Sequence, residues 1–433
     1  MRIAYLAAGA AGMYCGSCLH DNALAAALMA RGEDVVLAPI YTPIRTDERD
    51  VSERRVFFGG INAFLQQKFP LFRRTPRWLD GWLDHPTVLR LVASRGSSVD
   101  PAKLGDMTVS MLRGEEGNQT KELAKLVDWL LTEVRPDVVH LSNSMMLGLA
   151  RMISRRCGPP VICALSGEDI FLEKLVPPHY ESARELLRER AADVDAFTAL
   201  NGYFADYMAD YLAVPRDRIH VIPHGLNLAE ADGTAPPPTD GPPRIGYLAR
   251  ICADKGLHVL VEACELLADR RPSRAFELHV AGYLGAGDRK YFAELKRRIT
   301  AGPLRTRFRY HGEVSRAEKL AFLRSLRVMS TPTVYRESKG LPVLEAWACA
   351  RPTVLPAHGA FPEMCAATEG GVMHEPHDAK DLADKLLVFL DDPARAAEMG
   401  KRARQAMENS YNDWQMADRT LALYKTLVRE RGV

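Results

Sequence analysis

The stretch Ala229–Pro243 has the sequence AEADGTAPPPTDGPP, with five prolines and two glycines. Proline and glycine at this density, without hydrophobic periodicity, are typical of an exposed linker. The 433-residue chain is long enough for more than one domain. We therefore expect an N-terminal domain over residues 1–228, a linker over residues 229–243 and a C-terminal domain over residues 244–410.

The same pattern of short apolar runs and longer amphipathic runs occurs on both sides of this linker. Before it, the apolar runs are Ile3–Ala7, Asp34–Ile40, Asp137–Leu141, Pro160–Leu165, Ala196–Leu200 and Ile219–Ile222. After it, they are Arg244–Leu248, Phe276–Ala281, Phe308–Gly312, Arg327–Thr331, Pro352–Leu355 and Gly371–Met373. Continuous apolar strands that alternate with helices predict a parallel sheet covered on both faces.

The predicted fold class is therefore α/β, with two Rossmann-like doubly wound domains. Such sheets bind ligands at the carboxyl ends of their strands, so we expect the two domains to face a central cleft. The amphipathic run Tyr411–Val428 predicts a long helix, and residues 411–433 are expected to cross back to the first domain.

Composition and charge exclude several classes of protein. Hydrophobic residues make up 47% of the chain, so most of it should fold, and 57 basic against 55 acidic residues give no sign of a nucleic-acid partner. The short apolar start of the chain is typical of a buried strand, not of a signal peptide. We expect a cytoplasmic location.

One segment, Tyr335–Ala350 (YRESKGLPVLEAWACA), carries a candidate anion site. Pro342 is typical of the first turn of a helix, so the amides of Lys339, Gly340 and Leu341 are expected to stand free before it. Free amides and the helix dipole suit a diphosphate. The alternative is an ordinary solvated helix start.

Two carboxylates flank this helix start. In a continuous helix Glu337 and Glu345 would lie ~12 Å apart, wider than the ~5–9.5 Å between paired carboxylates of glycosidases. Carboxylates accept hydrogen bonds from vicinal hydroxyls, so one glutamate is expected on a ribose and one near a sugar.

A second segment, Ile245–Leu257, places two cations after a predicted strand. Arg250 and Lys255 lie in the loop before Gly256, where they would neutralise a diphosphate and stabilise its charge as it leaves. The alternative is that both are solvated loop charges.

Together these motifs resemble the GT4-type retaining glycosyltransferases of the GT-B fold. The resemblance rests on Glu337-x7-Glu345, Arg250-x4-Lys255-Gly256, Val221–Asn227 (VIPHGLN) and Gly359–Met364 (GAFPEM). It implies a hexosyltransferase-type enzyme that moves a sugar from a nucleotide-diphosphate donor to a hydroxyl acceptor, namely a glycan, a lipid or a small molecule. Retention of configuration and independence of metal or other cofactors are implied as well.

The resemblance also implies roles for individual residues. Arg250 and Lys255 would hold the diphosphate, Glu345 the ribose, and Glu337 would lie beside the donor sugar. The other implied donor contacts are Gly16 in the loop Gly9–Cys18, Val314 in the stretch His311–Val314, and the amides of Lys339, Gly340 and Leu341.

The chain departs from the family after the run Pro160–Leu165. Many relatives carry a histidine where Ser166 stands, and the nearest polar candidates here are Ser166, Glu168 and Asp169. Asp169 either accepts the proton of the acceptor hydroxyl, which makes it a catalytic candidate, or caps the following helix. Ser166, Glu168 and Asn143 are candidates for acceptor binding, with packing as the alternative for Asn143.

Two further segments leave alternatives open. Asp193-Val194-Asp195 matches the D-x-D pattern of metal-dependent glycosyltransferases but enters an apolar run, so we predict a strand start and no metal site. The arginine-rich aromatic stretch Phe69–Leu83 is either a lid over the acceptor or a peripheral contact with the inner face of a membrane.

Two other functions remain open from the sequence. The absent family histidine leaves a catalytically weak or inactive sugar-nucleotide-binding subunit as one alternative. A nucleotide-linked epimerase or oxidoreductase on similar domains is the other. The loop Gly9–Cys18 lacks the G-x-G-x-x-G spacing, so a dinucleotide cofactor has weak support.

Overall fold

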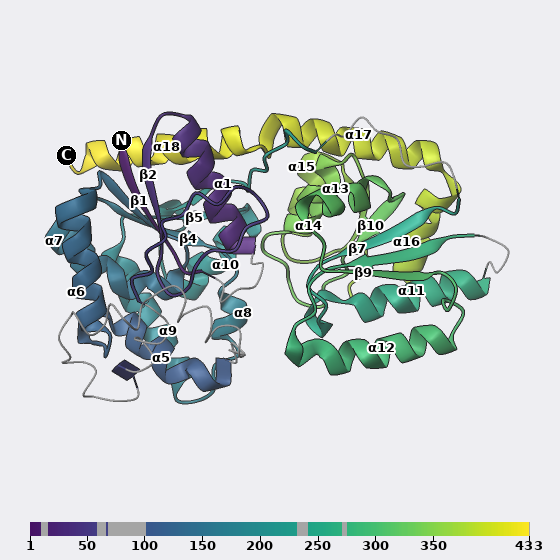
Figure 1. Cartoon of the computed structure of the whole chain (residues 1–433), viewed down its shortest axis with the longest axis horizontal. Helices are drawn as coiled ribbons and strands as arrows, with labels where there is room; N and C mark the ends of the chain where they lie inside the picture. Colours follow the sequence, from purple (N-terminus) through teal and green to yellow (C-terminus); the bar gives the residue numbers. More distant parts are fainter. Residues whose placement is uncertain (10–15, 59–65, 68–100, 232–240, 271–274, 433) are drawn as a thin grey trace. The chain divides into compact units, whose positions relative to one another are not determined.

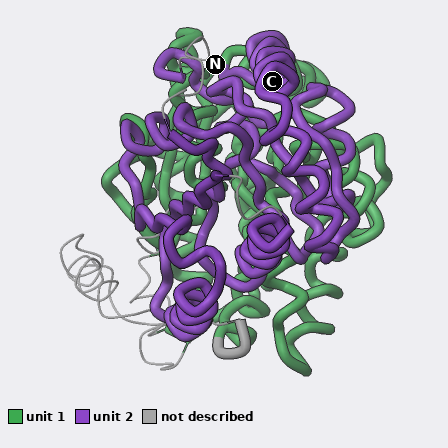
Figure 2. The backbone as a smooth tube through the Cα atoms, turned by 90° about the vertical axis from the view of Figure 1, so that its right-hand side faces the viewer, with its two compact units in different colours: residues 1–223, 414–433 green, residues 224–413 purple. Residues whose placement is uncertain are grey.

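The computed structural model describes residues 1–9, 16–58, 66–67, 101–231, 241–270 and 275–432 (Figure 1). Most of the predicted linker and all of Phe69–Leu83 lie outside these residues. The chain divides into two compact units (Figure 2). Unit 1 comprises Met1–Pro223 and Trp414–Val433, and unit 2 comprises His224–Asp413.

Unit 1 ends at Pro223 rather than at residue 228, because the next residues pair within unit 2. Leu226 forms a β-bridge with Asn412, and its amide donates to the carbonyl oxygen of Tyr411 at 2.9 Å. A Cβ atom on Gly225 would lie 2.2 Å from the carbonyl oxygen of Asn412, so only glycine allows this approach.

The sheet of unit 1 has six parallel strands in the order β2-β1-β3-β4-β5-β6. The strands are β1 (Arg2–Ala7), β2 (Asp34–Pro39), β3 (Val138–Leu141), β4 (Val161–Leu165), β5 (Ala196–Ala199) and β6 (Ile219–Val221). The helices are α1 (Gly16–Ala30), α5 (Pro101–Arg113), α6 (Thr120–Trp129), α7 (Ala150–Cys157), α8 (Asp169–Leu172), α9 (His179–Arg190), α10 (Gly202–Leu212) and α18 (Asp413–Glu430).

Alternation along β1 divides the core of unit 1 into two layers. Ile3 and Tyr5 point to one face, where α1 and α18 pack together (Figure 1). Ala4 and Leu6 point to the other face, which α5, α6, α7, α9 and α10 cover. Because both faces are covered, the strands are predominantly apolar on both sides.

Unit 2 repeats this architecture with the order β12-β11-β10-β7-β8-β9, again all parallel. Its strands are β7 (Arg244–Leu248), β8 (Glu277–Ala281), β9 (Phe308–Gly312), β10 (Val328–Ser330), β11 (Thr353–Pro356) and β12 (Gly371–His374). Its helices are α11 (Leu257–Arg270), α12 (Arg289–Ala301), α13 (Arg316–Arg324), α14 (Leu341–Ala348), α15 (Phe361–Thr368), α16 (Ala379–Asp391) and α17 (Pro393–Ser410).

Each apolar run predicted from the sequence forms a strand, and no strand end differs from the prediction by more than one residue. The α/β fold class with two doubly wound sheets is therefore confirmed. In the described parts of the chain, no helix combines the length and the apolar composition that crossing a bilayer requires.

A buried polar contact joins the last helix, α18, to the sheet of unit 1. Tyr424 of α18 hydrogen-bonds Nδ1 of His140 on β3, and the ring of Tyr5 lies 4.5 Å from the imidazole, measured between centroids. Burial, with a smaller contribution from His20, lowers the pKa of His140 to about 3. His140 is therefore neutral, and it holds α18 by a hydrogen bond and not by charge.

We predict that Tyr424→Phe lowers the free energy of unfolding by about 1–3 kcal/mol, because a buried imidazole nitrogen loses its partner. Urea denaturation monitored by circular dichroism measures this. Lys425→Ala, an exposed change on the same helix, should stay within about 0.5 kcal/mol of the wild type. Equal stability of the two variants would show that the hydrogen bond contributes nothing.

Candidate functional site

The strand order of unit 2 places a topological switch point between β7 and β10. From β7 the chain adds β8 and β9 on one side, and then β10, β11 and β12 on the other. Ligands of open α/β sheets bind at the carboxyl ends of the strands beside such a point. Here the loop after β7 carries Arg250 and Lys255, and the loop after β10 carries Glu337.

Close backbone contact holds these two loops together. The amide of Val334 donates to the carbonyl oxygen of Asp254 at 3.0 Å. Gly256 has a φ of 73°, and a Cβ atom there would lie 1.7 Å from the carbonyl oxygen of Pro332. Glycine at position 256 is thus required for Lys255 to reach the second loop.

Lys255, Tyr335 and Glu337 form a closed cluster where the loops meet. The ammonium of Lys255 lies 2.6 Å from Oε2 of Glu337 and also donates to the hydroxyl of Tyr335. That hydroxyl donates to the same carboxylate oxygen at 2.7 Å. The Lys255 ammonium lies 4.9 Å from the centre of the Tyr335 ring, within reach of a cation–π contact.

The second oxygen of Glu337 is also occupied. Oε1 accepts from the amides of Ser338 and Lys339, both at 3.2 Å. Burial alone would raise the pKa of Glu337, but Lys255, Tyr335 and the Lys339 amide together lower it to about 2. The carboxylate is therefore ionised at any physiological pH.

A third loop, after β11, fixes the backbone of Glu337. The amide of Ala360 donates to the carbonyl oxygen of Glu337 at 2.8 Å. Gly359 has a φ of 63°, and a Cβ atom there would lie 2.6 Å from the Glu337 nitrogen. The loops of three neighbouring strands, β11, β10 and β7, thus converge on one residue, Glu337.

Helix α14 begins beside this cluster, as predicted, with Pro342 in its first turn. Gly340 takes the left-handed conformation at the helix start, with a φ of 65°. Within the described part of the chain, the amides of Gly340 and Leu341 have no acceptor. The prediction of three free amides is wrong for Lys339, because its amide donates to Glu337.

Arg250 lies at the carboxyl end of β7 with an exposed side chain. Its Nε donates to the sulfur of Cys252 at 3.4 Å, and its carbonyl oxygen accepts from Tyr247 at 3.3 Å. Burial and Glu337 raise the pKa of Tyr335, and the charge of Arg250 acts in the opposite sense. The positive charge of Arg250 therefore acts on Tyr335, which also contacts Lys255.

Glu345 lies inside α14 and pairs with a lysine from another helix. Its Oε1 accepts from the ammonium of Lys319 on α13, and both side chains are largely buried. The two glutamates of the motif therefore have separate cationic partners. Val314 follows the edge strand β9, two strands from β7, and is not part of the Lys255 cluster.

Unit 1 has its own switch point, between β1 and β3. Gly16 begins α1 after β1, and the hydroxyl of its neighbour Ser17 lies 3.2 Å from that of Ser166 after β4. The Ser166 hydroxyl also lies 3.4 Å from the carbonyl oxygen of Ser142, after β3. Ser166 therefore joins three loops at this edge of the sheet.

Glu168 and Asn143 hold backbone at the same edge. Buried Glu168 accepts from the amide of Ser144 at 3.0 Å and from that of Ser166 at 2.6 Å. Asn143 accepts from the amide of Met145 at 3.1 Å and caps the short helix Ser144–Leu149. Both side chains thus stabilise the loops. For Asn143 this is the structural role that the sequence left open as the alternative to acceptor binding.

Asp169 stands in a different environment from Glu168. Burial, followed by the charge of Glu168, raises the pKa of Asp169 to about 6, although the amides at the start of α8 act against this. Its Oδ1 atom is buried and has no hydrogen-bond partner in the described residues. Asp169 is thus a carboxylate that can exchange a proton near neutral pH.

The two aspartates of the D-x-D match are engaged by arginines. Asp193 accepts from Nε of Arg151 at 3.1 and 3.2 Å. Asp195 accepts from Arg431 at 2.9 and 3.0 Å and from the amide of Val161 at 2.7 Å. Both carboxylates therefore serve structural ion pairs in unit 1.

Sequence reasoning missed Tyr335 and Lys319 as parts of the site. Tyr335 lies only two residues before Glu337, so its nearness in the sequence was the one available signal. Lys319 lies 26 residues before Glu345, and no pattern in the sequence connects the two.

Comparison with known proteins agrees with this geometry. Residues 233–406 match the model "Glycosyl transferases group 1", and residues 22–225 match the model "Glycosyl transferase 4-like domain". The chain belongs to the GT4-type glycosyltransferases of the GT-B fold. The first matched segment contains Lys255, Tyr335 and Glu337. The second contains Ser166 and Asp169.

Curated relatives include members of this family with different names. The chain is 29% identical over 311 residues to a D-inositol 3-phosphate glycosyltransferase of Arthrobacter sp. (strain FB24), covering 65% of this chain and 71% of the relative. It is 27% identical over 305 residues to a glycogen synthase of Mycobacterium tuberculosis, covering 69% and 70%.

Solved structures share the fold at low identity. Sucrose-phosphate synthase from Thermosynechococcus elongatus superposes with a TM-score of 0.71 at 18% identity, covering 99% of this chain and all of that one. HepE of Anabaena, solved in complex with UDP, gives 0.68 at 15% identity, covering 98% of this chain and all of that one.

A double-mutant cycle tests the Lys255–Tyr335 contact. We predict that Lys255→Ala and Tyr335→Phe are non-additive by about 0.5–3 kcal/mol in the free energy of unfolding, because each removes a partner of the other. Urea denaturation of the four proteins measures this coupling.

The control pairs Lys255→Ala with Tyr310→Phe. Tyr310 donates to the carbonyl oxygen of Gly282 at 3.2 Å and has no contact with Lys255. The effects of these two substitutions on the free energy of unfolding should be additive. Additivity in both cycles would contradict the cluster.

Proposed function

We propose that this glycosyltransferase is a retaining, metal-independent enzyme that moves a hexose from a nucleotide-diphosphate sugar to a hydroxyl group. The observation that carries the proposal is the pairing of Lys255 with Glu337 and Tyr335 at the switch point of unit 2. Tyr335 and Glu337 lie in the loop before α14, and the amides of Gly340 and Leu341 at the start of this helix lack acceptors in the described residues. Fixed cations and open amides together suit a diphosphate.

In the proposed mechanism, unit 2 binds the donor. Arg250 and Lys255 hold the diphosphate, and their positive charge stabilises the leaving group as the bond to the sugar breaks. This charge does the work that a divalent cation would otherwise supply. Lys255 keeps one ammonium hydrogen for the phosphate after donating to Glu337 and Tyr335.

The remaining donor contacts follow from the same arrangement. The amides of Gly340 and Leu341 bind phosphate or sugar oxygens, and Glu345 binds the ribose hydroxyls. Gly16 and Val314 complete the donor contacts as the family resemblance implies.

Acceptor binding is proposed for unit 1. Ser166 lies where three loops meet and contacts Ser17, and the neighbouring Asp169 carboxylate has a pKa raised to about 6. Asp169 orients the acceptor hydroxyl and takes its proton as the hydroxyl attacks the face that the nucleotide leaves. A glycan, a lipid or a small molecule fits this chemistry, and the predicted location of the reaction is the cytoplasm.

A thermal-shift screen with UDP-, GDP- and ADP-sugars identifies the donor. A ligand at 100 times its dissociation constant adds about 2.7 kcal/mol of stability. HepE is solved with UDP, so UDP-sugars are the first to test. A donor that binds without transfer or hydrolysis at high enzyme concentration would instead favour the inactive subunit that the missing histidine suggests.

We predict that Arg250→Ala lowers turnover roughly 100-fold or more, because the leaving diphosphate loses a fixed cation. The side chain is exposed, so the free energy of unfolding should change by about 0.5 kcal/mol or less. Lys290→Ala removes another exposed cation of unit 2 and should leave both quantities unchanged. Equal turnover of the two variants would remove Arg250 from the site.

The pH dependence of kcat/KM tests Asp169. Because the raised pKa of Asp169 is about 6, we predict that activity falls as the pH drops below this value and the carboxylate becomes protonated. Asp169→Asn should lower kcat/KM by roughly 10²–10⁴-fold and abolish this acid limb.

Glu173→Gln is the matched control for Asp169. Glu173 lies nearby after α8, where it pairs with Arg184 and Tyr180 on the surface. This variant should keep the rate and the acid limb, with the limb moved slightly to lower pH because the charge of Glu173 contributes to the raised pKa of Asp169. If the Asp169→Asn enzyme kept the limb, the titration would belong to another group, and Asp169 would not be the base.

A further inference from the structure

A strongly basic run lies outside the donor site of unit 2. Residues 296–309 (KRRITAGPLRTRFR) contain six basic residues and neither aspartate nor glutamate. The structure gathers these six at one end of the unit, and we call them the basic edge: Lys296, Arg297, Arg298, Arg305, Arg307 and Arg309.

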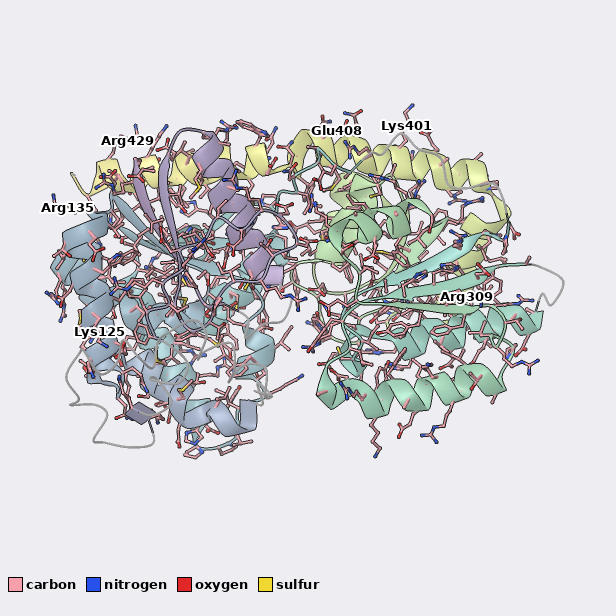
Figure 3. The ribbon with its side chains drawn as sticks, in the orientation of Figure 1. Lys125, Arg135, Arg309, Lys401, Glu408 and Arg429 are labelled. Carbon is pink, nitrogen blue, oxygen red and sulfur yellow. The ribbon has the colours of Figure 1, made fainter. Side chains whose placement is uncertain are left out.

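A tight turn brings the basic edge together. The last turn of α12 carries Arg298, directly after Arg297, and the amide of Arg305 donates to the carbonyl oxygen of Gly302 at 3.3 Å. Arg309 then lies in β9, the edge strand of the sheet (Figure 3). All six side chains except the half-buried Arg307 are exposed.

The basic edge lies at the opposite end of the sheet from the donor residues. All strands are parallel, and Arg309 on β9 pairs in register with His279 on β8. Arg309 belongs to the first residues of its strand, whereas Arg250 and Lys255 follow the last residues of β7. A partner bound at the basic edge therefore leaves the diphosphate site open.

Acidic neighbours neutralise only part of this charge. Nε of Arg298 lies 2.9 Å from Oε2 of Glu265, and Nη2 of Arg309 lies 3.4 Å from Oε1 of Glu277. Lys296, Arg297 and Arg305 form no ion pair with the acidic residues of the described chain. The positive potential of the basic edge therefore comes mainly from Lys296, Arg297 and Arg305, which these two pairs leave uncompensated.

Two imidazoles, His279 and His311, lie beside the basic edge. Burial lowers the pKa of His279, and Arg244 and Arg309 lower it further against the opposing effect of Glu277. Burial, His279 and Arg244 likewise lower the pKa of His311. The charge of Arg309 thus reaches His279, but burial is the main cause of both shifts.

From this geometry we propose that the basic edge docks unit 2 on the anionic headgroups of a phospholipid membrane. Lys and Arg near an anionic leaflet attract it through charge alone and need no apolar insertion. Nucleic acid fits less well, because single strands stack their bases on exposed aromatic rings. Phe276 is buried beneath Arg307, and Phe308 is half-buried.

Vesicle co-sedimentation of the full chain tests the proposal. We expect binding to vesicles of phosphatidylcholine with phosphatidylglycerol and none to phosphatidylcholine alone. Binding should disappear as added salt shortens the screening length from about 10 Å at about 0.1 M to about 3 Å at about 1 M. No binding to the mixed vesicles, or equal binding to both kinds, would overturn it.

A charge variant and a matched control locate the surface. Replacing Lys296, Arg297 and Arg305 with Gln should lower vesicle binding by roughly one to two orders of magnitude. Replacing Lys380, Arg395 and Lys401 with Gln removes the same charge from α16 and α17 and should leave binding unchanged. Figure 3 labels Lys401. Equal loss in both variants would mean that net charge, not the basic edge, drives binding.

Two further measurements complete the test. Donor affinity by thermal shift should be the same in both variants and the wild type, because the basic edge is remote from the diphosphate site. Binding of a single-stranded oligonucleotide that depends on the basic edge, in a protein that does not bind the mixed vesicles, would assign the surface to nucleic acid and refute the membrane proposal.

Discussion

The buried ion pair between Glu337 and Lys255 is the interaction on which the site of unit 2 depends. A buried carboxylate is costly unless it is paired and hydrogen-bonded, and Glu337 accepts from Lys255, Tyr335 and the amides of Ser338 and Lys339. These donors come from the loops after β7 and β10, and the loop after β11 holds the Glu337 backbone. The strand order β11-β10-β7 is therefore a condition for the carboxylate to be stable.

This pairing also changes the role expected for Glu337. Its carboxylate is occupied on both oxygens and has a pKa of about 2, so it remains charged and holds the Lys255 ammonium in place. The cation is thus positioned before any ligand arrives, and preorganised charge of this kind costs little reorganisation during reaction. Glu337 therefore positions the Lys255 ammonium, in addition to its proposed place beside the donor sugar.

Unit 1 shows how neighbouring carboxylates acquire different properties. Glu168 satisfies the amides of Ser144 and Ser166 and ties two loops together. Asp169, the next residue, is partly buried beside that charge, so its pKa is raised to about 6. A carboxylate with a pKa raised toward neutral pH, as for Asp169, is typical of sites that transfer protons.

The sequence by itself determined the twelve strands, the α/β class, the position of α14 and the family, because strand alternation, a proline in a first helical turn and motif spacing are local properties. Only the tertiary structure decided that Lys255 meets Tyr335 across 80 residues, and that the predicted free amide of Lys339 is occupied. It also decided that Lys319 neutralises Glu345 and that a run of six basic residues forms one edge. Such contacts depend on strand order and loop approach, which bring together residues that no local pattern links.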